Sequence, residues 1–417
     1  MQLEDSLRSE REHALRVCLA RMRRAPLDFR LRVEAGELLV DLGEVARGVR
    51  VLKSCADYFT LAGFPLRALW ALKLLERFRA EPSLVDRGLQ LLARHYAHRE
   101  GAQWGEPIYE MPLPRVGELS LAELPEDVAS VVAEVDRRAT DIISGTSFPD
   151  RLPRFPLLSD LSAATFVEVA RAIRLRRVPD GFVLVEQGEV AAAVQLLVTG
   201  LARTLRRQDD GVEAEAGIYG EGEMLGEMAL LTGSPRRTTV VARGRVNALE
   251  IPESVVTDLG GRAHELRQAL ARQICHRTVE QLVRERRLFG ALEPAVERTL
   301  ITAFEARLVD AGEVIIREGQ ADALALHVIL DGLVSVVVTR DGMPHEVARL
   351  REGELIGEIA LVRRAPATAT CRAVRRTVLM SLTAEAFDRV VREAPALADA
   401  MAQLGDRRIL DNIFSLA

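Results

Sequence analysis

The feature that most constrains this chain is a repeat in its C-terminal part. Gly181 and Gly188 recur further along the chain as Gly312 and Gly319, both at the same offset. That offset also relates Gly222, Gly226, Glu227 and Pro235 to Gly353, Gly357, Glu358 and Pro366. Gly332 repeats Gly200 one position later than the offset requires, which a single inserted loop residue explains. An offset kept over so many positions predicts a duplicated domain that covers about residues 151–417.

Each copy is predicted to be mainly β-structure. In the first copy, a helix around Leu161 to Ile173 precedes short apolar runs at 182–185, 195–198, 201–205, 213–216 and 238–242. Short, closely spaced strands with glycine turns are typical of an antiparallel barrel. A helical pattern then runs from Ser254 to about Arg287, and its apolar face carries Leu266, Leu270, Ile274, Val279 and Leu282.

The stretch from Gly222 to Thr239 has the residues of an anion site. It reads G-E-M-L-G-E-M-A-L-L-T-G-S-P-R-R-T-T. Glycines let the backbone approach a ligand closely, and a short helix beginning near Glu227 would direct free N–H groups at an anion. Arg236 can donate two hydrogen bonds to a phosphate, and Glu227 can accept hydrogen bonds from a sugar hydroxyl. Such a segment can hold a ribose cyclic phosphate.

This stretch resembles the phosphate-binding cassette of cyclic-nucleotide-binding domains, whose pattern is G-E-[LIM]-A-L-x(4)-P-R-x-[AST]. The matching residues are Gly226, Glu227, Met228, Ala229, Leu230, Pro235, Arg236, Arg237 and Thr238. The resemblance implies that Glu227 binds the ribose 2′-hydroxyl and Arg236 the cyclic phosphate. Arg237 stands where a small residue is usual, and Thr238 where Ala is commonest. The alternative for Glu227 and Arg236 is a surface ion pair, which would leave the fixed spacing of glycine and proline unexplained.

The second copy keeps most of this cassette but not its arginine. The residues that correspond to a ligand site are Gly357, Glu358, Ile359, Ala360 and Thr368, whereas Ala367 stands in place of the phosphate arginine. A charge-assisted hydrogen bond contributes roughly 1.5–3 kcal/mol, so its loss costs about ten- to hundred-fold in affinity. Arg363 or Arg364 could compensate from the loop. Alternatively, Glu358 only interacts with backbone N–H groups where its helix begins.

Residues 1–100 are predicted to form a helical domain. Apolar stripes at helical spacing are interrupted at Gly43, at Gly63-Phe64-Pro65 and at Glu81-Pro82-Ser83. The helix lengths and breaks look like a short tetratricopeptide-type solenoid, although the full signature is absent. Such a stack implies a surface for a protein partner or for self-association. The alternative is a helical cap that packs on the rest of the chain.

Residues 101–150 are predicted to be a Pro-rich linker with one helix, from about Pro125 to Ile143. The segment Arg137-Arg138-Ala139-Thr140 resembles the sequence with which regulatory subunits of cAMP-dependent kinase occupy the kinase cleft. Asp141 follows it where that motif has an apolar residue. The alternative to a kinase-inhibitory segment is a solvated helix face.

We therefore predict an α+β protein, with an N-terminal α-helical solenoid and two β-barrel (jelly-roll) cyclic-nucleotide-binding domains at 151–287 and 288–417, the second degenerate. In this family the helix after the barrel closes over the base, here the segment from about Ala263 to Arg287. Leu282, Leu288 and Phe289 are candidates for the base contact, although the alternative, that each is a core residue, is favoured. The predicted function is a cytoplasmic sensor of cAMP, or less favourably cGMP, that signals to a protein partner. The alternatives are a nucleotide-independent scaffold and a kinase-inhibitory subunit.

Net charge and residue spacing argue against several other functions. The net charge of −5 gives no reason to expect general nucleic-acid affinity. The segment after Ala384 is too short for the helix-turn-helix of bacterial cAMP-dependent transcription factors, so we expect no DNA binding. The four cysteines and seven histidines show no metal or nucleophile spacing, so we expect no metal and no catalysis. We also expect no signal peptide and no membrane span.

Overall fold

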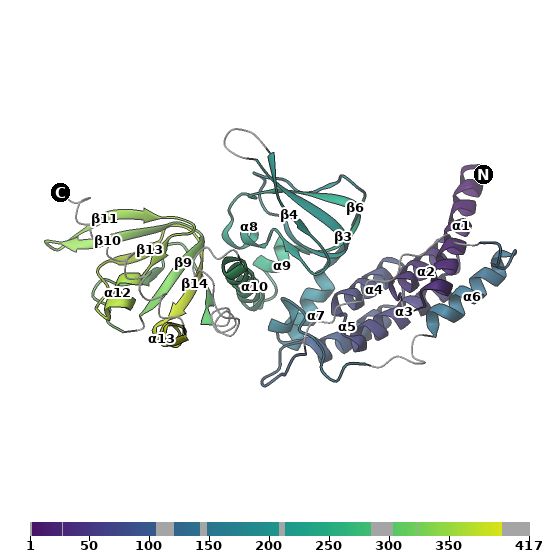
Figure 1. Cartoon of the computed structure of the whole chain (residues 1–417), viewed down its shortest axis with the longest axis horizontal. Coiled ribbons are helices and arrows are strands. Elements are labelled where there is room, and N and C mark those ends of the chain that lie inside the picture. Colours follow the sequence, from purple (N-terminus) through teal and green to yellow (C-terminus); the bar gives the residue numbers. More distant parts are fainter. Residues whose placement is uncertain are drawn as a thin grey trace.

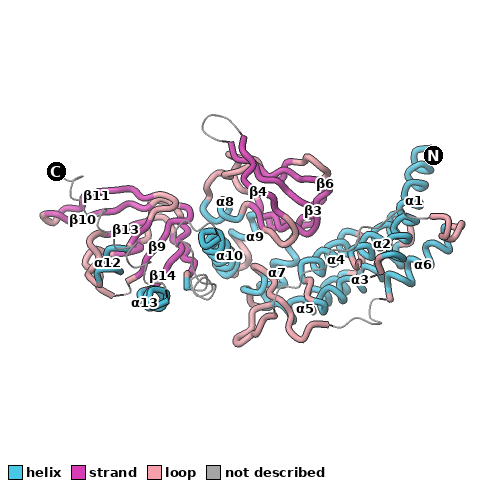
Figure 2. Tube along the Cα trace, viewed as in Figure 1, coloured by secondary structure: helices cyan, strands magenta, loops and turns pink. Residues whose placement is uncertain are grey.

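The computed structural model describes residues 2–26, 28–105, 121–141, 148–207, 213–284, 303–322 and 324–393. Figure 1 shows the helices of the N-terminal region at one end of the molecule, a first β unit in the middle and a second β unit at the other end. Helix α10 lies between the two β units. Figure 2 shows how strands are concentrated in these two units and helices in the N-terminal region.

Five helices form the N-terminal region, namely α1 (Gln2–Arg24), α2 (Arg30–Asp41), α3 (Val45–Ala62), α4 (Pro65–Arg77) and α5 (Pro82–Tyr96). The breaks in the sequence predict the boundaries between α2, α3, α4 and α5, but not the one between α1 and α2. Gly63 ends α3 in the left-handed conformation, with φ of 91°. Pro65 and Pro82 begin α4 and α5, because a proline at the first helical position loses no intrahelical hydrogen bond. The tetratricopeptide-type arrangement of these helices stays a prediction.

Helix α4 is buried on all sides, whereas its sequence predicts one apolar stripe. Every residue from Pro65 to Leu75 is buried, including Arg67 and Lys73. The helix packs between α3 and α5 and also contacts strands β1 and β3 of the first β unit. Lys73 Nζ donates to the backbone oxygen of Arg171, at 2.8 Å. One face of the N-terminal helical region is therefore packed against the first β unit.

Helix α6 (Val128–Thr140) packs against α1, α2 and α3, although the sequence places it in a linker. Asp127 caps it by accepting a hydrogen bond from the Ser130 N–H at 2.7 Å. The Arg137-Arg138-Ala139-Thr140 segment is its last turn, and Ala139 is fully buried. In this structure the segment is not presented as the extended chain that a kinase cleft would bind.

The first β unit contains α7 (Ala163–Ala172), β1 (Arg174–Val178), β2 (Val183–Val185), β3 (Ala193–Arg207), β4 (Glu213–Tyr219), β5 (Met224–Leu225), α8 (Glu227–Thr232), β6 (Thr239–Pro252), α9 (Glu253–Thr257) and α10 (Ala263–Arg284). A short 3-10 helix, Leu158–Asp160, precedes them. The strands pair antiparallel in the order β1-β6-β3-β4, with β2 beside β6 and β5 beside β3. Their closure into a barrel stays a prediction.

Two details of this unit differ from the sequence prediction. Strand β3 joins two predicted runs into one, because Gly200 (φ 91°) turns the strand with a shift of register instead of ending it. The helix predicted from Ser254 to about Arg287 is two helices. Gly260 and Gly261 separate α9 from α10, since both adopt positive φ that a helix cannot continue. Residues 285–302 lie outside the described part.

The second unit repeats these elements. It contains β7 (Glu305–Val309), β8 (Val314–Ile316), β9 (Ala325–Asp331), β10 (Val334–Arg340), β11 (Met343–Leu350), β12 (Leu355–Ile356), α12 (Glu358–Arg363), β13 (Thr370–Ala373), β14 (Thr377–Thr383) and α13 (Ala384–Glu393). Two antiparallel sheets have the orders β11-β10-β13-β8 and β12-β9-β14-β7. The starts of β7, β8 and α12 follow those of β1, β2 and α8 at the offset found in the sequence, so the predicted duplication is confirmed.

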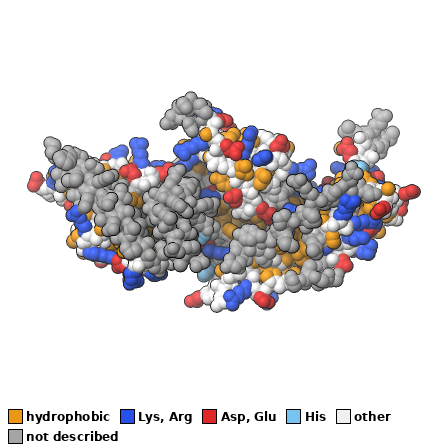
Figure 3. All heavy atoms as spheres, in the orientation of Figure 1, with side chains coloured by type: hydrophobic (Ala, Val, Ile, Leu, Met, Phe, Trp, Pro, Cys, Tyr) orange, Lys and Arg blue, Asp and Glu red, His pale blue; other side chains and the backbone are white. Residues whose placement is uncertain are grey.

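Among the described residues, no helix is both long enough and apolar enough to cross a membrane. Figure 3 shows basic and acidic side chains interspersed on the face in view. Apolar residues form one large cluster through the helices and both units, and a smaller cluster inside each β unit.

Candidate functional site

Gly226 is the position at which the first cassette most needs a glycine. It precedes α8 with φ of 83°. A Cβ built there would overlap the Arg236 guanidinium, whose Cζ would lie only 2.6 Å away. A side chain at this position would therefore strain the backbone and displace the arginine.

Arg236 is buried, with 8% of its surface exposed. Its guanidinium donates to two backbone oxygens, those of Ala193 at 2.5 Å and Gly226. Burial lowers the pKa of this guanidinium, which Glu189 partly opposes. No carboxylate of the described residues forms an ion pair with it. A buried cation that contacts only carbonyl oxygens is poorly compensated and is suited to binding an anion.

Glu227 is the first residue of α8 and is 3% exposed. Its carboxylate pairs with Arg277, which comes from α10. Arg277 also donates to the Met224 oxygen at 2.8 Å. Sequence reasoning missed this arginine, because nothing in the helical pattern of α10 distinguishes it from its neighbours. Through Arg277, the carboxylate of the cassette is attached to the helix that lies between the two units.

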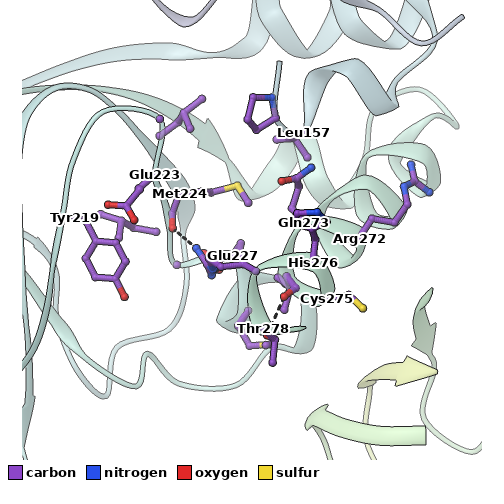
Figure 4. Close-up of a pocket in the computed structure, with 18 of the residues that line it drawn as sticks. Leu157, Tyr219, Glu223, Met224, Glu227, Arg272, Gln273, Cys275, His276 and Thr278 are labelled. Carbon is purple, nitrogen blue, oxygen red and sulfur yellow. Dashed lines mark hydrogen bonds and ion pairs between the residues drawn. The ribbon is translucent and has the colours of Figure 1, made fainter. Parts of the chain in front are cut away.

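Both predicted charged residues line the same cavity, which has a volume of about 1480 Å³. Of the predicted ligand residues, the cavity wall contains Gly226, Glu227, Met228, Ala229, Arg236, Arg237 and Thr238. Pro235 is exposed and is absent from the lining, so it shapes the loop and does not face the cavity. Figure 4 shows Tyr219, Glu223 and Met224 on one side and Gln273 and His276 of α10 on the other.

Sequence reasoning missed several other groups in this wall. Tyr219 and Thr204 line it from β4 and β3. The Thr204 hydroxyl oxygen is buried and has no hydrogen-bond partner in the described structure. The alternation of side chains along β3 could have predicted that Thr204 faces inward, but no sequence motif identifies it as a ligand residue. Of the proposed base contacts, the side chain of Leu282 and the whole of Leu288 and Phe289 lie outside the described residues.

The second cassette forms its own cavity, of about 230 Å³. All five predicted residues line it, namely Gly357, Glu358, Ile359, Ala360 and Thr368, together with Ala367. Glu358 is 4% exposed. The predicted compensation by Arg363 or Arg364 is not seen, because neither is among the lining residues and Arg364 pairs with Asp388 on α13.

The end of the first cassette contacts the second unit directly. Asp331 at the end of β9 is 1% exposed and accepts a hydrogen bond from the Thr232 hydroxyl at 2.6 Å. It also pairs with Arg237 at 3.0 Å and with Arg375 at 2.8 Å. Burial raises the pKa of Asp331, but Thr232 and the two arginines together lower it below its usual value. The unusual Arg237 of the cassette thus bonds to the second unit.

Comparison with known proteins decides what the two β units are. Residues 175–262 and 306–394 each match the family model of the cyclic nucleotide-binding domain. Two segments of the chain thus match this domain model in tandem. We call them the first and the second domain.

Among curated proteins, the chain is similar to the cAMP-dependent protein kinase regulatory subunit of Blastocladiella emersonii, with 27% identity over 248 residues. That match covers 59% of this chain and 58% of the relative. It is also similar to the patatin-like phospholipase domain-containing protein 7 of Rattus norvegicus, with 23% identity over 57% of this chain and 16% of the relative. The chain thus spans well under two thirds of either protein.

Among solved structures, the regulatory domain of Toxoplasma gondii PKA with cAMP is similar at 18% identity. The match covers 60% of this chain and 92% of that chain, with a TM-score of 0.30. The family match thus supports cyclic nucleotide-binding domains in both β units.

Proposed function

We propose that the protein is a cyclic-nucleotide sensor whose first domain binds cAMP. The observation that carries the proposal is the Arg236 guanidinium, which is buried among backbone oxygens in the cavity that Glu227 also lines. A cyclic phosphate would supply the anion that this cation lacks. Glu227 would accept a hydrogen bond from the ribose 2′-hydroxyl. The unpartnered Thr204 hydroxyl offers a further polar contact in the same wall.

Signal transmission would pass through α10. In this structure Glu227 is held by Arg277 of that helix. A ribose at Glu227 would share the carboxylate with Arg277, so ligand affinity would depend on the position of α10. Helix α10 also packs against β7 of the second domain. A movement of α10 on ligand binding would therefore also displace the second domain.

The output would reach a protein partner through the N-terminal helices, which we propose to be of tetratricopeptide type in a cytoplasmic protein that can self-associate. Arg67 of α4 forms a bidentate ion pair with Glu221, at 2.6 and 2.7 Å. Glu221 precedes Gly222, a residue of the cavity wall. This contact would link the occupancy of the first domain to the helices.

The test is thermal unfolding of the full chain with and without millimolar cAMP or cGMP. A ligand that binds only the folded state raises its stability by about 2.7 kcal/mol at one hundred times its Kd. We expect stabilisation by cAMP, stronger than by cGMP, that is lost in Arg236→Ala and kept in Glu358→Ala. No stabilisation of the unaltered chain would favour the scaffold function. Loss in Glu358→Ala but not in Arg236→Ala would mean that the two sites are assigned to the wrong domains.

A further inference from the structure

The sheet of the first domain has an outer face, which points away from the cavity. We propose that this outer face binds an acidic amphipathic helix of a protein partner. The proposal does not depend on nucleotide binding, since it concerns side chains on the other side of the sheet. It rests on the register of the strands, on exposed apolar side chains and on unpaired arginines.

The register of the strands assigns side chains to the two faces of the sheet. Thr204 of β3 pairs with Val240 of β6, and both residues line the cavity. Successive side chains of a strand point to opposite faces. The neighbouring pair, Arg203 with Val241, therefore faces outward. Ile218 of β4 lies opposite Arg203 in the register and extends this row across the sheet.

Exposed apolar side chains lie on adjacent strands of the outer face. Leu201, Ile218 and Val183 are 43%, 49% and 44% exposed, and Val183 of β2 pairs with Val241. Single exposed apolar residues are normal, whereas a group of them on neighbouring strands indicates a binding surface. Strands lie ~4.8 Å apart, so four of them span about 14 Å, which exceeds the roughly 10 Å diameter of a helix. The face is therefore wide enough for one helix.

Three arginines lie around these apolar side chains. Arg203 stands in the outward row, and Arg243 lies opposite Leu201 in the register. Arg245 follows the bend that Gly244 makes with φ of 78°. All three are exposed, and none has a side-chain hydrogen bond or ion pair with another described residue. A partner can therefore pair with these guanidinium groups without breaking a contact within the described part of the chain.

An acidic partner with apolar side chains fits both parts of this surface. Side chains on one face of a sheet stand roughly perpendicular to it, so the longer arginines extend beyond the leucine, isoleucine and valine. The apolar side chains thus form a floor, and the guanidinium groups form a rim. A helix with a stripe of Leu flanked by Glu would place the stripe on the floor and its carboxylates at the rim.

The outer face favours a helix over other acidic partners. Its middle offers no free backbone groups, because β6 and β3 are each paired on both sides. An extended segment laid across it would find no partners for its own N–H and C=O groups, whereas a helix pairs its own. A nucleic-acid backbone would pair with the arginines but has no apolar group for the floor. A bilayer would meet the guanidinium rim before its acyl chains reached the floor.

Fluorescence anisotropy of labelled peptides with the full chain, without nucleotide, tests the proposal. The probe is a peptide of about 18 residues, roughly five helical turns, with Leu at i, i+3, i+4 and i+7 and Glu on both flanks of this stripe. Two matched peptides replace Glu by Lys or Leu by Ser. We expect the acidic Leu peptide to bind and the Lys peptide not to bind. The Ser peptide should bind at least tenfold more weakly than the acidic Leu peptide.

Variants of the chain locate the binding surface. Arg203→Glu combined with Arg243→Glu should weaken binding of the acidic Leu peptide at least tenfold. The matched control is Arg87→Glu combined with Arg94→Glu, which changes the net charge equally and should leave binding unchanged. These two arginines of α5 are also exposed and make no side-chain hydrogen bond or ion pair with other described residues. Leu201→Ser keeps every charge and should weaken binding at least threefold.

The proposal is overturned if the acidic Leu peptide does not bind at millimolar concentration, or if the two double variants weaken its binding equally. Phosphatidylserine vesicles and a single-stranded oligonucleotide are the other anions to compare. Tighter binding of either one than of the peptide, lost in the Arg203→Glu and Arg243→Glu variant, would overturn the choice of a protein partner. Circular dichroism shows whether each variant is folded. None of these outcomes bears on cAMP binding, which the thermal unfolding test measures separately.

Discussion

Asp331 provides the sharpest test of how the two domains are joined. It is 1% exposed and bonds to Thr232, Arg237 and Arg375, two of which belong to the first cassette. Removing one partner of a buried charge pair costs about 3–5 kcal/mol when the remaining charge stays buried. Here the two arginines are 39% and 43% exposed, so water can solvate them after the change. We therefore expect Asp331→Ala to cost about 2 kcal/mol, below the range for a fully buried pair.

The assay is hydrogen exchange of the intact protein, followed in peptides that cover residues 228–240. A loss of about 2 kcal/mol corresponds to roughly thirty-fold faster opening of this segment, since RT is about 0.59 kcal/mol. Asp310→Asn is the matched control, because its carboxylate is 76% exposed and pairs with Arg376 at 3.0 Å. The control should change exchange by less than about 0.5 kcal/mol.

The pH dependence of this effect has a definite sign. The neighbours of Asp331 lower its pKa in the folded protein, so its contribution is complete above the ordinary carboxyl pKa of about 4. The contribution is lost as the pH falls through the folded value. The difference between the unaltered chain and Asp331→Ala should thus shrink in acid. Equal exchange of the two proteins at neutral pH would refute the interdomain role of this carboxylate.

Three further changes test other parts of the structure. Gly226→Ala should weaken the proposed cAMP binding at least tenfold in titrations, because the added methyl displaces the Arg236 guanidinium. Glu134→Gln should destabilise by about 1 kcal/mol near neutral pH in urea unfolding, since the hydrogen bond from Arg23 lowers the pKa of Glu134 to about 2. The contribution is lost as the pH falls from about 4.5 towards 2, where the two unfolding curves should converge. Arg67→Ala should lower the free energy of unfolding by about 1–3 kcal/mol, because it removes the ion pair with Glu221. Faster hydrogen exchange of the loop at Glu221 would report this change.

Much of the fold could be predicted because its boundaries are set by local chemistry. Helices α4 and α5 begin at Pro65 and Pro82, because proline has a fixed φ and no N–H to donate. Helix α3 ends at Gly63, because glycine can adopt positive φ. These effects do not depend on how the helices pack. The repeat was visible for the same reason, since its glycines occupy turns that require positive φ. The cassette residues were predicted from the resemblance of 226–238 to the family pattern and from the chemistry of Glu227 and Arg236.

What the sequence did not reveal depends on contacts between distant segments. Strand β1 reads R-L-R-R-V and shows no apolar alternation, because Arg177 pairs with Glu37 of α2 and Arg176 with Glu250 of β6. Arg277 was missed because its role depends on where α10 crosses the cassette. Pairings of this kind join residues that only tertiary structure brings together.

The burial of α4 has a practical consequence for anyone who shortens this chain. The helix covers part of β1 and β3, and its Arg67 pairs with Glu221 beside the cavity of the first domain. A fragment that began near residue 150 would expose the parts of β1 and β3 that α4 covers, and Glu221 would lose its ion pair with Arg67. Affinities measured on such a fragment would describe a different electrostatic environment, and its solubility would fall.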